Sequence, residues 1–378
     1  MSMTVYLDYN ATAPLCAAAI QAMNDAMMWI GNPSSVHGYG RKSRHVIEQA
    51  RQDVANCLNV SSQRVVFTSG ATEANNMALA HFPGRVLVSA IEHDSVRLVC
   101  PDAMMIPVNE AGIVDLLALE NLLAEGYEGA TLISVMAAHN ETGVIQPLSA
   151  IIGLARKYKA CVHSDCVQGV GRLDFPWHTL DMLSLSAHKI GGPAGVGCLI
   201  VHPDWPIKAL LKGGGQERSL RPGTENIIGI MGMAAALSQS KKVDWSQVSS
   251  LRVYMEKTLL TLSPDSVVIG QHSARLPNTT LITMPGVKSE TQVMNLDLQG
   301  FAVSSGAACS SGKVRTSHSL QAMGVPKAAQ SSALRVSLCP TTTEAEVKVF
   351  IQAWNQVYER CANNNNTALV YVTKQKTS

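Results

Sequence analysis

Five short apolar segments of the sequence each end in polar side chains of the types that bind ligands or move protons. The segments are residues 64–68, 85–89, 131–136, 161–165 and 182–186. The polar groups that follow them lie at 70–72, 92–93, 139–143, 163–168 and 186–189. A single histidine or aspartate at such a place is usually a structural hydrogen-bonding residue or a helix cap. Because the carboxyl ends of strands in an open α/β sheet meet in one crevice, five such groups together predict a ligand site.

The group Gly70-Ala71-Thr72 stands at the start of an expected helix. Backbone N–H groups, a hydroxyl and the helix dipole at such a turn can bind a phosphate. Taken alone, the turn is also compatible with an ordinary N-cap. A nucleotide-binding loop is another hypothesis. However, the sequence contains neither G-x-x-x-x-G-K-[ST] nor a G-x-G-x-x-G that opens a helix after the first strands.

Lys189 follows the last of these segments, among small residues and with no other charged neighbour in the run. Burial of such an amine lowers its pKa and makes it a nucleophile. A surface lysine is the alternative. Together with Asp165 one strand earlier and a phosphate turn, Lys189 meets the requirements of pyridoxal 5'-phosphate (PLP). That cofactor needs a Schiff-base lysine, an acidic partner for its ring nitrogen and a phosphate site.

The nine cysteines are scattered, odd in number and without a C-x-x-C pair, so a disulfide framework is not expected. Most of them should be small buried hydrophobic residues. Cys309 differs because it lies within 304–312, nine consecutive small residues that predict a mobile loop. An exposed thiol on such a loop is a liability unless it reacts, which favours a functional Cys309 over a tolerated surface cysteine. A metal site at His163, Asp165 and Cys166 is a weaker alternative, since no second cluster has zinc spacing.

The elements that would position these groups follow an α/β pattern. The strand segments, with one more at 196–201, alternate with helical patterns at 41–58, 115–125 and 148–159. This alternation favours a largely parallel sheet with both faces covered. After residue 250 the pattern becomes a smaller α+β arrangement, with strands at 279–284 and 333–338 and a helix at 343–359. We therefore expect a large PLP-binding domain at 13–245 and a small domain of 1–12 plus 246–378 that carries the mobile Cys loop.

Composition narrows the function classes. Of 378 residues, 46% are apolar and 15% charged, and the formal charge is +2. These values exclude global disorder and argue against a dedicated nucleic-acid binder. No apolar run is long enough to span a bilayer, and residues 1–8 show no signal peptide. We expect a cytoplasmic protein that binds neither nucleic acid nor a membrane.

Beyond these patterns, the chain carries a series of specific motifs from end to end. They are LDYNAT at 7–12, NPSSVH at 32–37, TSGATEANN at 68–76, EH at 92–93, NETG at 140–143, HSD at 163–165 with Gln168, SAHK at 186–189, GGGQE at 213–217, RPGTEN at 221–226 and the Cys309 loop. In this order they resemble the cysteine desulfurases (NifS/IscS-like), in the class V aminotransferase branch of the fold-type-I PLP enzymes. The small-residue Cys loop is similar to the group that supplies iron–sulfur cluster assembly.

The resemblance implies a role for each matching residue. Lys189 would bind the cofactor covalently, Asp165 would pair with its ring nitrogen and Gln168 with its phenolic oxygen. His93 would stack on the ring and help to move protons, with Asn140 beside it. The residues implied to bind the phosphate are Ala71, Thr72, Ser186 and His188, with Thr224 from the partner of a homodimer. Arg335, with Asn10 nearby, would bind the substrate carboxylate as a bidentate partner.

The resemblance also implies the reaction. L-cysteine would be converted to L-alanine, and Cys309 would take the sulfur as a persulfide for an iron–sulfur scaffold protein or another sulfur acceptor. A selenocysteine lyase or a small-substrate aminotransferase of the same fold is the alternative, and neither would need Cys309. A non-catalytic subunit should have lost Lys189 or Asp165, and both are present. His139, Cys166 and Pro222 depart from the usual asparagine, alanine and serine of the family.

Overall fold

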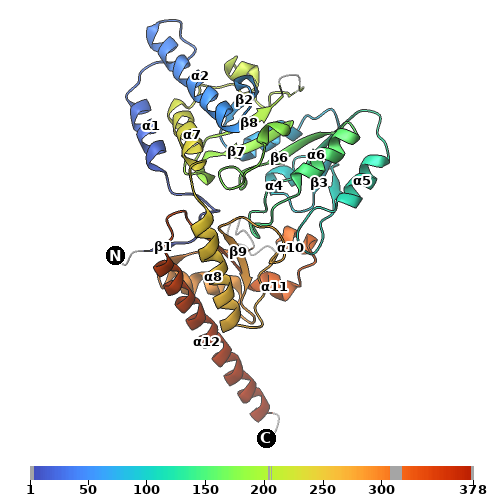
Figure 1. Ribbon diagram of the computed structural model, residues 1–378, viewed down its shortest axis with the longest axis vertical. Coiled ribbons are helices and arrows are strands. Elements are labelled where there is room, and N and C mark those ends of the chain that lie inside the picture. Colours follow the sequence, from blue (N-terminus) through green and yellow to red (C-terminus); the bar gives the residue numbers. More distant parts are fainter. Residues whose placement is uncertain (1–3, 203–204, 206, 307–316, 376–378) are drawn as a thin grey trace. The chain divides into compact units, whose positions relative to one another are not determined.

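The computed structural model describes residues 4–202, 205, 207–306 and 317–375, and of residues 361–375 it describes the backbone alone. The chain divides into two units, which are described separately (Figure 1). The larger unit comprises Thr12–His139 and Ile145–Val243, and the smaller comprises Met1–Ala11, Asn140–Val144 and Asp244–Ser378.

The segment Asn140–Val144 is where this division differs from the expected one, which kept it in the large domain. Gly143 O accepts a hydrogen bond from Leu276 N at 2.8 Å, and Val144 forms an antiparallel bridge with Arg275. These backbone contacts place the motif at 140–143 in the smaller unit.

The larger unit is built on a seven-stranded sheet, among the described residues, in the order β2-β8-β7-β6-β5-β3-β4. The strands are β2 (Val65–Thr68), β3 (Gly84–Ser89), β4 (Met104–Ile106), β5 (Ala130–Ser134), β6 (Cys161–Asp165), β7 (Met182–Ser186) and β8 (Gly197–Val201). Strands β4, β3, β5, β6 and β7 pair in parallel, and β8 is antiparallel to both of its neighbours. The sheet is therefore mostly parallel, as the sequence predicts, and the three-residue β4 is the strand that the apolar pattern did not reveal.

Helices cover both faces of this sheet, so successive strand residues enter different cores. On one face the core includes Val65 and Phe67, and on the other it includes Val66. The first core also contains residues of α1 (Ala17–Met27), α2 (Gly38–Leu58), α5 (Leu116–Ala124), α6 (Leu148–Lys157) and α7 (Ile227–Ser240). The second contains residues of α3 (Ala71–Leu79) and α4 (Asp94–Arg97). Coverage on both faces explains why the strands are almost entirely apolar.

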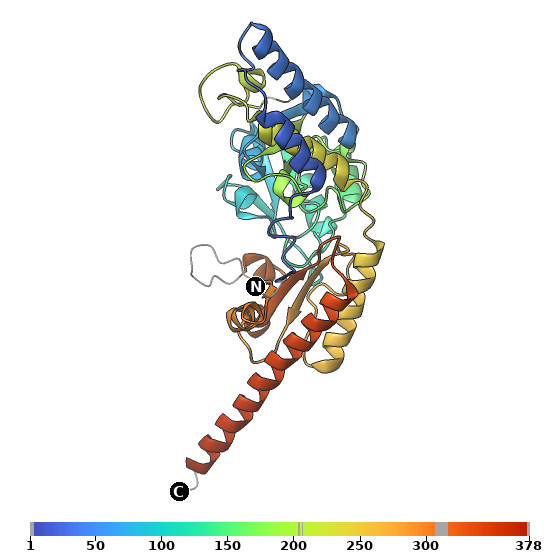
Figure 2. The ribbon, with the colours of Figure 1, turned by 90° about the vertical axis from the view of Figure 1, so that its left-hand side faces the viewer.

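The smaller unit has an antiparallel sheet of three described strands in the order β11-β12-β9, and a separate parallel pair of β1 and β10. The strands are β1 (Val5–Tyr6), β9 (Thr279–Thr283), β10 (Phe301–Ala302), β11 (Ser304–Ser305) and β12 (Ala333–Ser337). The helices are α8 (Ser246–Leu262), α9 (Ser289–Asp297), α10 (His318–Ala322), α11 (Lys327–Ser332) and α12 (Glu344–Gln375). Helices α12 and α8 lie side by side (Figure 2), and Trp354 and Phe350 of α12 are fully buried in the core of this unit.

Several elements of the structure were not expected from the sequence. Helices α1, α10 and α11 are absent from the sequence prediction, and α10 and α11 are short, with five and six residues. The final helix was expected over 343–359, and its backbone continues to Gln375, so the asparagine run at 363–366 lies inside it. Among the described helices, none is both long and apolar enough to cross a membrane.

Candidate active site

Asp165 lies at the carboxyl end of β6, and both oxygens of its carboxylate are held by N–H donors. Oδ1 accepts from Val167 N at 3.0 Å and Oδ2 accepts from Asn75 Nδ2 at 2.8 Å. The side chain is 8% exposed. It is thus a buried, fixed carboxylate at a strand end, which suits the acidic partner of a heterocyclic nitrogen.

His163 is on the same strand but has a structural role. It is fully buried, and its Nδ1 and Nε2 lie 2.8 Å from Ser134 Oγ and 3.0 Å from Ser184 Oγ. Burial lowers the pKa of His163 to about 3, so the ring stays neutral. The structure does not support the metal hypothesis, because the described residues contain no group of three or more histidine, cysteine or acidic side chains placed to bind a metal. Cys166 is buried, and burial raises the pKa of its thiol.

His93 caps α4 and is anchored through one ring nitrogen. Its Nδ1 accepts from Ser95 N at 3.1 Å and lies 2.8 Å from Ser95 Oγ. Asn75 Nδ2 donates to Ser95 Oγ at 2.9 Å, and the same nitrogen bonds to Asp165. His93 itself is exposed. Two of the predicted residues, His93 and Asp165, are therefore connected through two residues to which the sequence analysis gave no role.

The first turn of α3 forms a tight cradle beside β7 and β8. Gly70 precedes the helix, and no side chain caps it there. A Cβ on Gly197 would lie 2.7 Å from Gly70 Cα, so a side chain at Gly197 would clash with this turn. Ser186 Oγ lies 3.8 Å from the position that a Cβ on Gly70 would take. The uncapped turn that starts with Ala71 and Thr72 thus lies next to a hydroxyl, an arrangement that suits a phosphate.

A glutamate fixes the geometry of this turn. Glu73 Oε2 accepts from Ser69 N at 2.6 Å, and Oε1 accepts from Arg221 Nε at 2.9 Å. Arg221 belongs to the segment that continues to Thr224 and α7. Thr224 is exposed and makes none of the contacts described above. The structure therefore places Thr224 on the chain segment that Glu73 holds, but not among the predicted phosphate ligands of its own chain.

The segment before Arg221 is held by a buried ion pair. Arg51 donates to both oxygens of Glu217, at 2.6 and 2.7 Å, and Glu217 Oε2 also accepts from Phe67 N at 2.9 Å. Glu217, Arg218 and Ser219 of the 3-10 turn η4 (Gln216–Ser219) have positive φ angles of 45, 56 and 63°. Three consecutive non-glycine residues in this region are strained, and the ion pair contributes to holding them.

Lys189 ends the 3-10 turn η3 (Ala187–Lys189), which directly follows β7. It is half-buried, and its carbonyl accepts from Arg172 Nη2 at 3.2 Å. His188 Nδ1 lies 3.2 Å from Thr12 Oγ1. Burial, together with the charge of Lys189, lowers the pKa of His188 to about 4, so this ring is neutral at pH 7.

Gln168 is buried near the same strand end, and its Oε1 accepts a hydrogen bond from Arg172 Nη1. Since the oxygen serves as that acceptor, the amide Nε2 is the end suited to donate to a ligand oxygen. Strands β6 and β7 are parallel neighbours, with Asp165 opposite Ser184. Asp165, Gln168, Ser186 and Lys189 therefore follow the carboxyl ends of adjacent strands, as predicted.

The remaining predicted residues, Arg335, Asn10 and Asn140, lie together in the smaller unit. Arg335 Nη2 donates to Asp8 Oδ1 at 2.8 Å, and Nη1 donates to the Asn140 carbonyl at 3.2 Å. The same carbonyl accepts from Asn10 Nδ2 at 3.3 Å. Arg335 Nε is buried and has no hydrogen-bond partner among the described residues. The sequence analysis gave Asp8 no role, although it lies in the motif at 7–12.

Arg335 and Asn140 border a cavity of about 570 Å³, which is also lined by Glu141, Ser304 and Ser305. A guanidinium that borders a cavity can bind a carboxylate. Burial raises the pKa of Glu141 to about 7, although its hydrogen bond with Ser317 and the charge of Arg335 act in the opposite direction.

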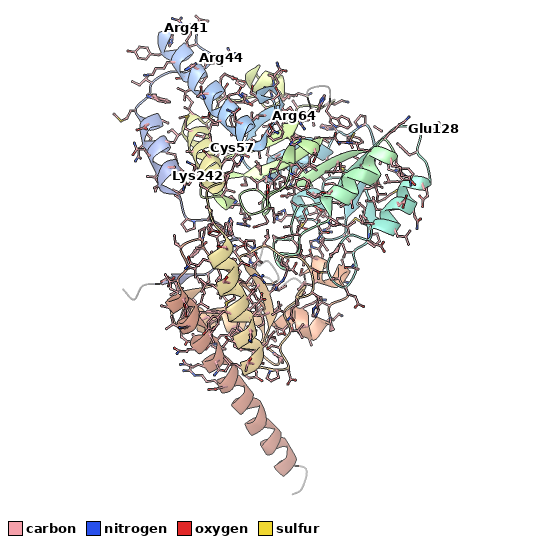
Figure 3. The ribbon with its side chains drawn as sticks, in the orientation of Figure 1. Arg41, Arg44, Cys57, Arg64, Glu128 and Lys242 are labelled. Carbon is pink, nitrogen blue, oxygen red and sulfur yellow. The ribbon has the colours of Figure 1, made fainter. Side chains whose placement is uncertain are left out.

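The cysteines among the described residues differ in how deeply they are buried. Cys166, Cys198 and Cys339 are buried, and Cys16, Cys57, Cys100 and Cys161 are half-buried. We expected most of the cysteines to be small buried hydrophobic residues; these four are only partly buried, and they pack against the two cores of the larger unit. Cys57 extends from near the carboxyl end of α2 (Figure 3), and burial raises the pKa of its thiol. Cys309 lies outside the described residues.

Comparison with known proteins agrees with this geometry. Residues 5–350 match the family model described as "Aminotransferase class-V". This chain belongs to that family. It is 35% identical to "Cysteine desulfurase IscS" of Dictyoglomus turgidum over 95% of this chain and 96% of that protein. It is also 39% identical to "Cysteine desulfurase" of Cereibacter sphaeroides, over 91% and 92%.

The fold agrees as well. The chain is similar to the X-ray structure of a NifS-like protein from Rickettsia africae, with a TM-score of 0.88, 36% identity and coverage of 94% of this chain and 99% of that one. Members of the family are PLP-dependent enzymes, and the fold is that of the fold-type-I class. The residues present fit the cofactor, because the larger unit offers a fixed carboxylate, a strand-end lysine and an uncapped helix turn beside Ser186.

Proposed function

We propose that this chain is a PLP-dependent cysteine desulfurase. It converts L-cysteine to L-alanine and leaves the sulfur as a persulfide on Cys309. The observation that supports this most strongly is the parallel pairing of β6 and β7, with Asp165 and Lys189 at their carboxyl ends. It occurs in a chain that aligns over more than nine-tenths of its length with two cysteine desulfurases.

Most of the residues proposed to bind the cofactor belong to the larger unit. Lys189 would hold PLP covalently, Asp165 would pair with the ring nitrogen and Gln168 would donate to the phenolic oxygen. His93 would stack on the ring, and Asn140 is a further candidate contact of the cofactor. Phosphate ligands are Ala71, Thr72, Ser186 and His188, with Thr224 contributed by the second subunit of a homodimer. When bound, PLP accepts the electron pairs released at the substrate carbons.

The chain's own residues bind the substrate and move its protons. Arg335 binds the substrate carboxylate as a bidentate partner, while Asp8 and the Asn140 carbonyl orient its guanidinium through Nη2 and Nη1. Lys189 Nζ takes the proton from the substrate α-carbon, and His93 is the second proton-transfer group. Cys309 acts as a thiolate on the substrate sulfur.

The sulfur transfer balances without an external oxidant. The S–S bond to Cys309 forms as the substrate Cβ–S bond breaks, and the electron pair of that bond stays with the carbon, which is later protonated to the methyl group of alanine. L-cysteine and the Cys309 thiol thus give L-alanine and a Cys309 persulfide. The persulfide then supplies iron–sulfur cluster assembly or a related sulfur transfer in the cytoplasm, through an acceptor or scaffold protein.

An assay of purified protein tests this proposal. With PLP, L-cysteine and a thiol reductant, we expect equal amounts of alanine and sulfide, together with a visible absorption band that Lys189→Ala abolishes. Full alanine production by Cys309→Ala would contradict the persulfide route. Turnover of selenocysteine but not cysteine would favour a selenocysteine lyase. Absence of the band even after PLP is added would indicate a non-catalytic protein.

A further inference from the structure

Asn75 and Ser95 connect two residues of the proposed PLP site that lie 72 positions apart in the sequence (93 against 165). Asn75, on α3, is fully buried. Its Nδ2 donates to Asp165 Oδ2 at 2.8 Å and to Ser95 Oγ at 2.9 Å, and Ser95 Oγ lies 2.8 Å from His93 Nδ1. We propose that Asn75 and Ser95 are positioning residues that fix the His93 ring in its Nε2–H tautomer and hold the Asp165 carboxylate.

The orientation of the Asn75 amide follows from its surroundings. Asp165 is an acceptor, so the amide must direct Nδ2 toward it, since the flipped amide would place two oxygens against each other. Asn75 Oδ1 is buried and has no partner among the described residues. The two N–H groups of the amide therefore donate to Asp165 and Ser95, and the amide oxygen accepts no hydrogen bond from the described residues. A buried acceptor without a hydrogen bond destabilises the folded state, so we infer that the two hydrogen bonds donated by Asn75 Nδ2 have a role.

The direction of the next bond follows from the first. Ser95 Oγ accepts from Asn75, so its single O–H is available for His93 Nδ1. The backbone N–H of Ser95 also donates to His93 Nδ1, at 3.1 Å. Two donors facing one nitrogen require that this nitrogen carries a lone pair. The neutral ring must then carry its proton on Nε2.

The consequence for the site rests on the proposed function. With Nδ1 anchored to Ser95, the exposed His93 ring presents an N–H donor at Nε2, which suits a substrate sulfur or oxygen acceptor. At the other end of the network, the same Asn75 amide holds Asp165 at the oxygen that Val167 does not engage. One buried side chain thus orients the residue that faces the ring nitrogen and the residue that stacks on the ring.

The competing hypothesis is that Asn75 only holds α3 against its neighbours. Two pairs of variants separate the hypotheses. Ser95→Ala removes the hydroxyl, and Ser95→Thr keeps one. Asn75→Leu has a similar volume and no donors, and Asn75→Gln keeps the amide. A packing role predicts that none of these changes the protonation site of His93.

The test is magic-angle-spinning NMR of the full-length PLP-loaded protein labelled with ¹⁵N-histidine, with the His93 signals assigned from their loss in His93→Asn. We expect an unprotonated Nδ1 and a protonated Nε2 in the native chain and in Ser95→Thr. In Ser95→Ala and Asn75→Leu we expect the unprotonated Nδ1 signal to lose part of its intensity, since the Ser95 backbone N–H remains as a donor to Nδ1. If Asn75→Leu does not fold, Ser95→Ala decides alone.

A protonated Nδ1 in the native chain would overturn the proposal, and so would an unchanged spectrum of Ser95→Ala. The spectrum is recorded without turnover. A failure of the desulfurase assay would therefore not alter this result, and the two proposals fail separately.

Discussion

The Arg335 guanidinium and the Asp8 carboxylate form a partly buried ion pair of 2.8 Å, although the two residues are 327 positions apart in the sequence. Arg335 is 8% exposed and borders the cavity of the smaller unit. Asp8 Oδ2 in turn accepts from Ser304 Oγ at 2.8 Å, so the carboxylate that orients Arg335 is itself held. Asp8 and Ser304 thus fix the orientation of the guanidinium that we propose binds the substrate carboxylate.

Arg335→Lys tests whether this guanidinium binds the carboxylate of L-cysteine. Lysine lacks the planar donor pair, and a hydrogen bond to a charged group contributes about 1.5–3 kcal/mol. We expect the KM for L-cysteine to rise by about 10- to 100-fold, with a smaller change in kcat. Asp8→Asn, which keeps an oxygen for Nη2, should raise KM less. An unchanged KM in Arg335→Lys would remove this residue from the proposed substrate site.

Glu141→Gln should change how stability depends on pH. A carboxyl group whose folded pKa is raised from 4.5 to about 7 binds more protons folded than unfolded between these values. The free energy of unfolding is therefore highest below about pH 4.5, where the group is protonated in both states. It falls by roughly 3 kcal/mol as the pH rises through 7. Between pH 5 and pH 8, the thermal midpoint of Glu141→Gln should fall less than that of the native chain.

The matched control for this experiment is Glu359→Gln, an exposed position of the same unit. It should reproduce the pH dependence of the native chain. Equal losses between pH 5 and pH 8 in the native chain and in Glu141→Gln would show that Glu141 does not titrate in this range.

Glu217→Ala should strongly destabilise the larger unit. It leaves Arg51, 4% exposed, as a buried charge without its carboxylate, and removal of one partner from a buried ion pair costs about 3–5 kcal/mol. We expect a markedly lower thermal midpoint. The double variant Arg51→Met with Glu217→Leu should be more stable than Glu217→Ala, because it leaves no buried charge. The reverse order would contradict a role of the ion pair in holding η4.

Glu73→Gln should weaken PLP binding. The substitution keeps one oxygen acceptor for either Ser69 N or Arg221 Nε, but not for both. If the less ordered phosphate turn lowers the free energy of PLP binding by about 1 kcal/mol, the dissociation constant of PLP rises about fivefold. Spectrophotometric titration of the apoprotein measures it, with the exposed Glu125→Gln as control. An unchanged dissociation constant would separate Glu73 from the phosphate turn.

The sequence predicts the parallel sheet and its strand-end residues well, because both depend on local patterns. Apolar runs covered on both faces end in polar motifs, and Asp165, Ser186 and Lys189 lie where such motifs predict them. The sequence does not predict the role of a side chain whose hydrogen-bond partners lie on other strands. His163 has the type and spacing of a ligand, but hydroxyls of the neighbouring strands β5 and β7 take both of its nitrogens.

Long-range pairs explain what the sequence did not reveal. Asp8 and Asn75 gain their roles through residues far along the chain, and Ser95 joins the network through Asn75, so no local sequence pattern predicts these contacts. Asp8 and Asn75 do lie in motifs that carry the family resemblance, which was the available signal. The placement of Asn140 with Arg335 likewise follows from pairing with a segment more than 130 residues away (275 against 144).

Sulfur transfer to Cys309 is the central claim, and mass spectrometry tests it most directly. The PLP-loaded protein is mixed with L-cysteine without reductant, alkylated and digested, and the peptide that contains Cys309 is analysed. We expect that this peptide gains one sulfur atom, that the gain disappears on reduction, and that one alanine is released for each persulfide. Alanine release with no added sulfur on Cys309, or with the sulfur on another cysteine, would contradict it.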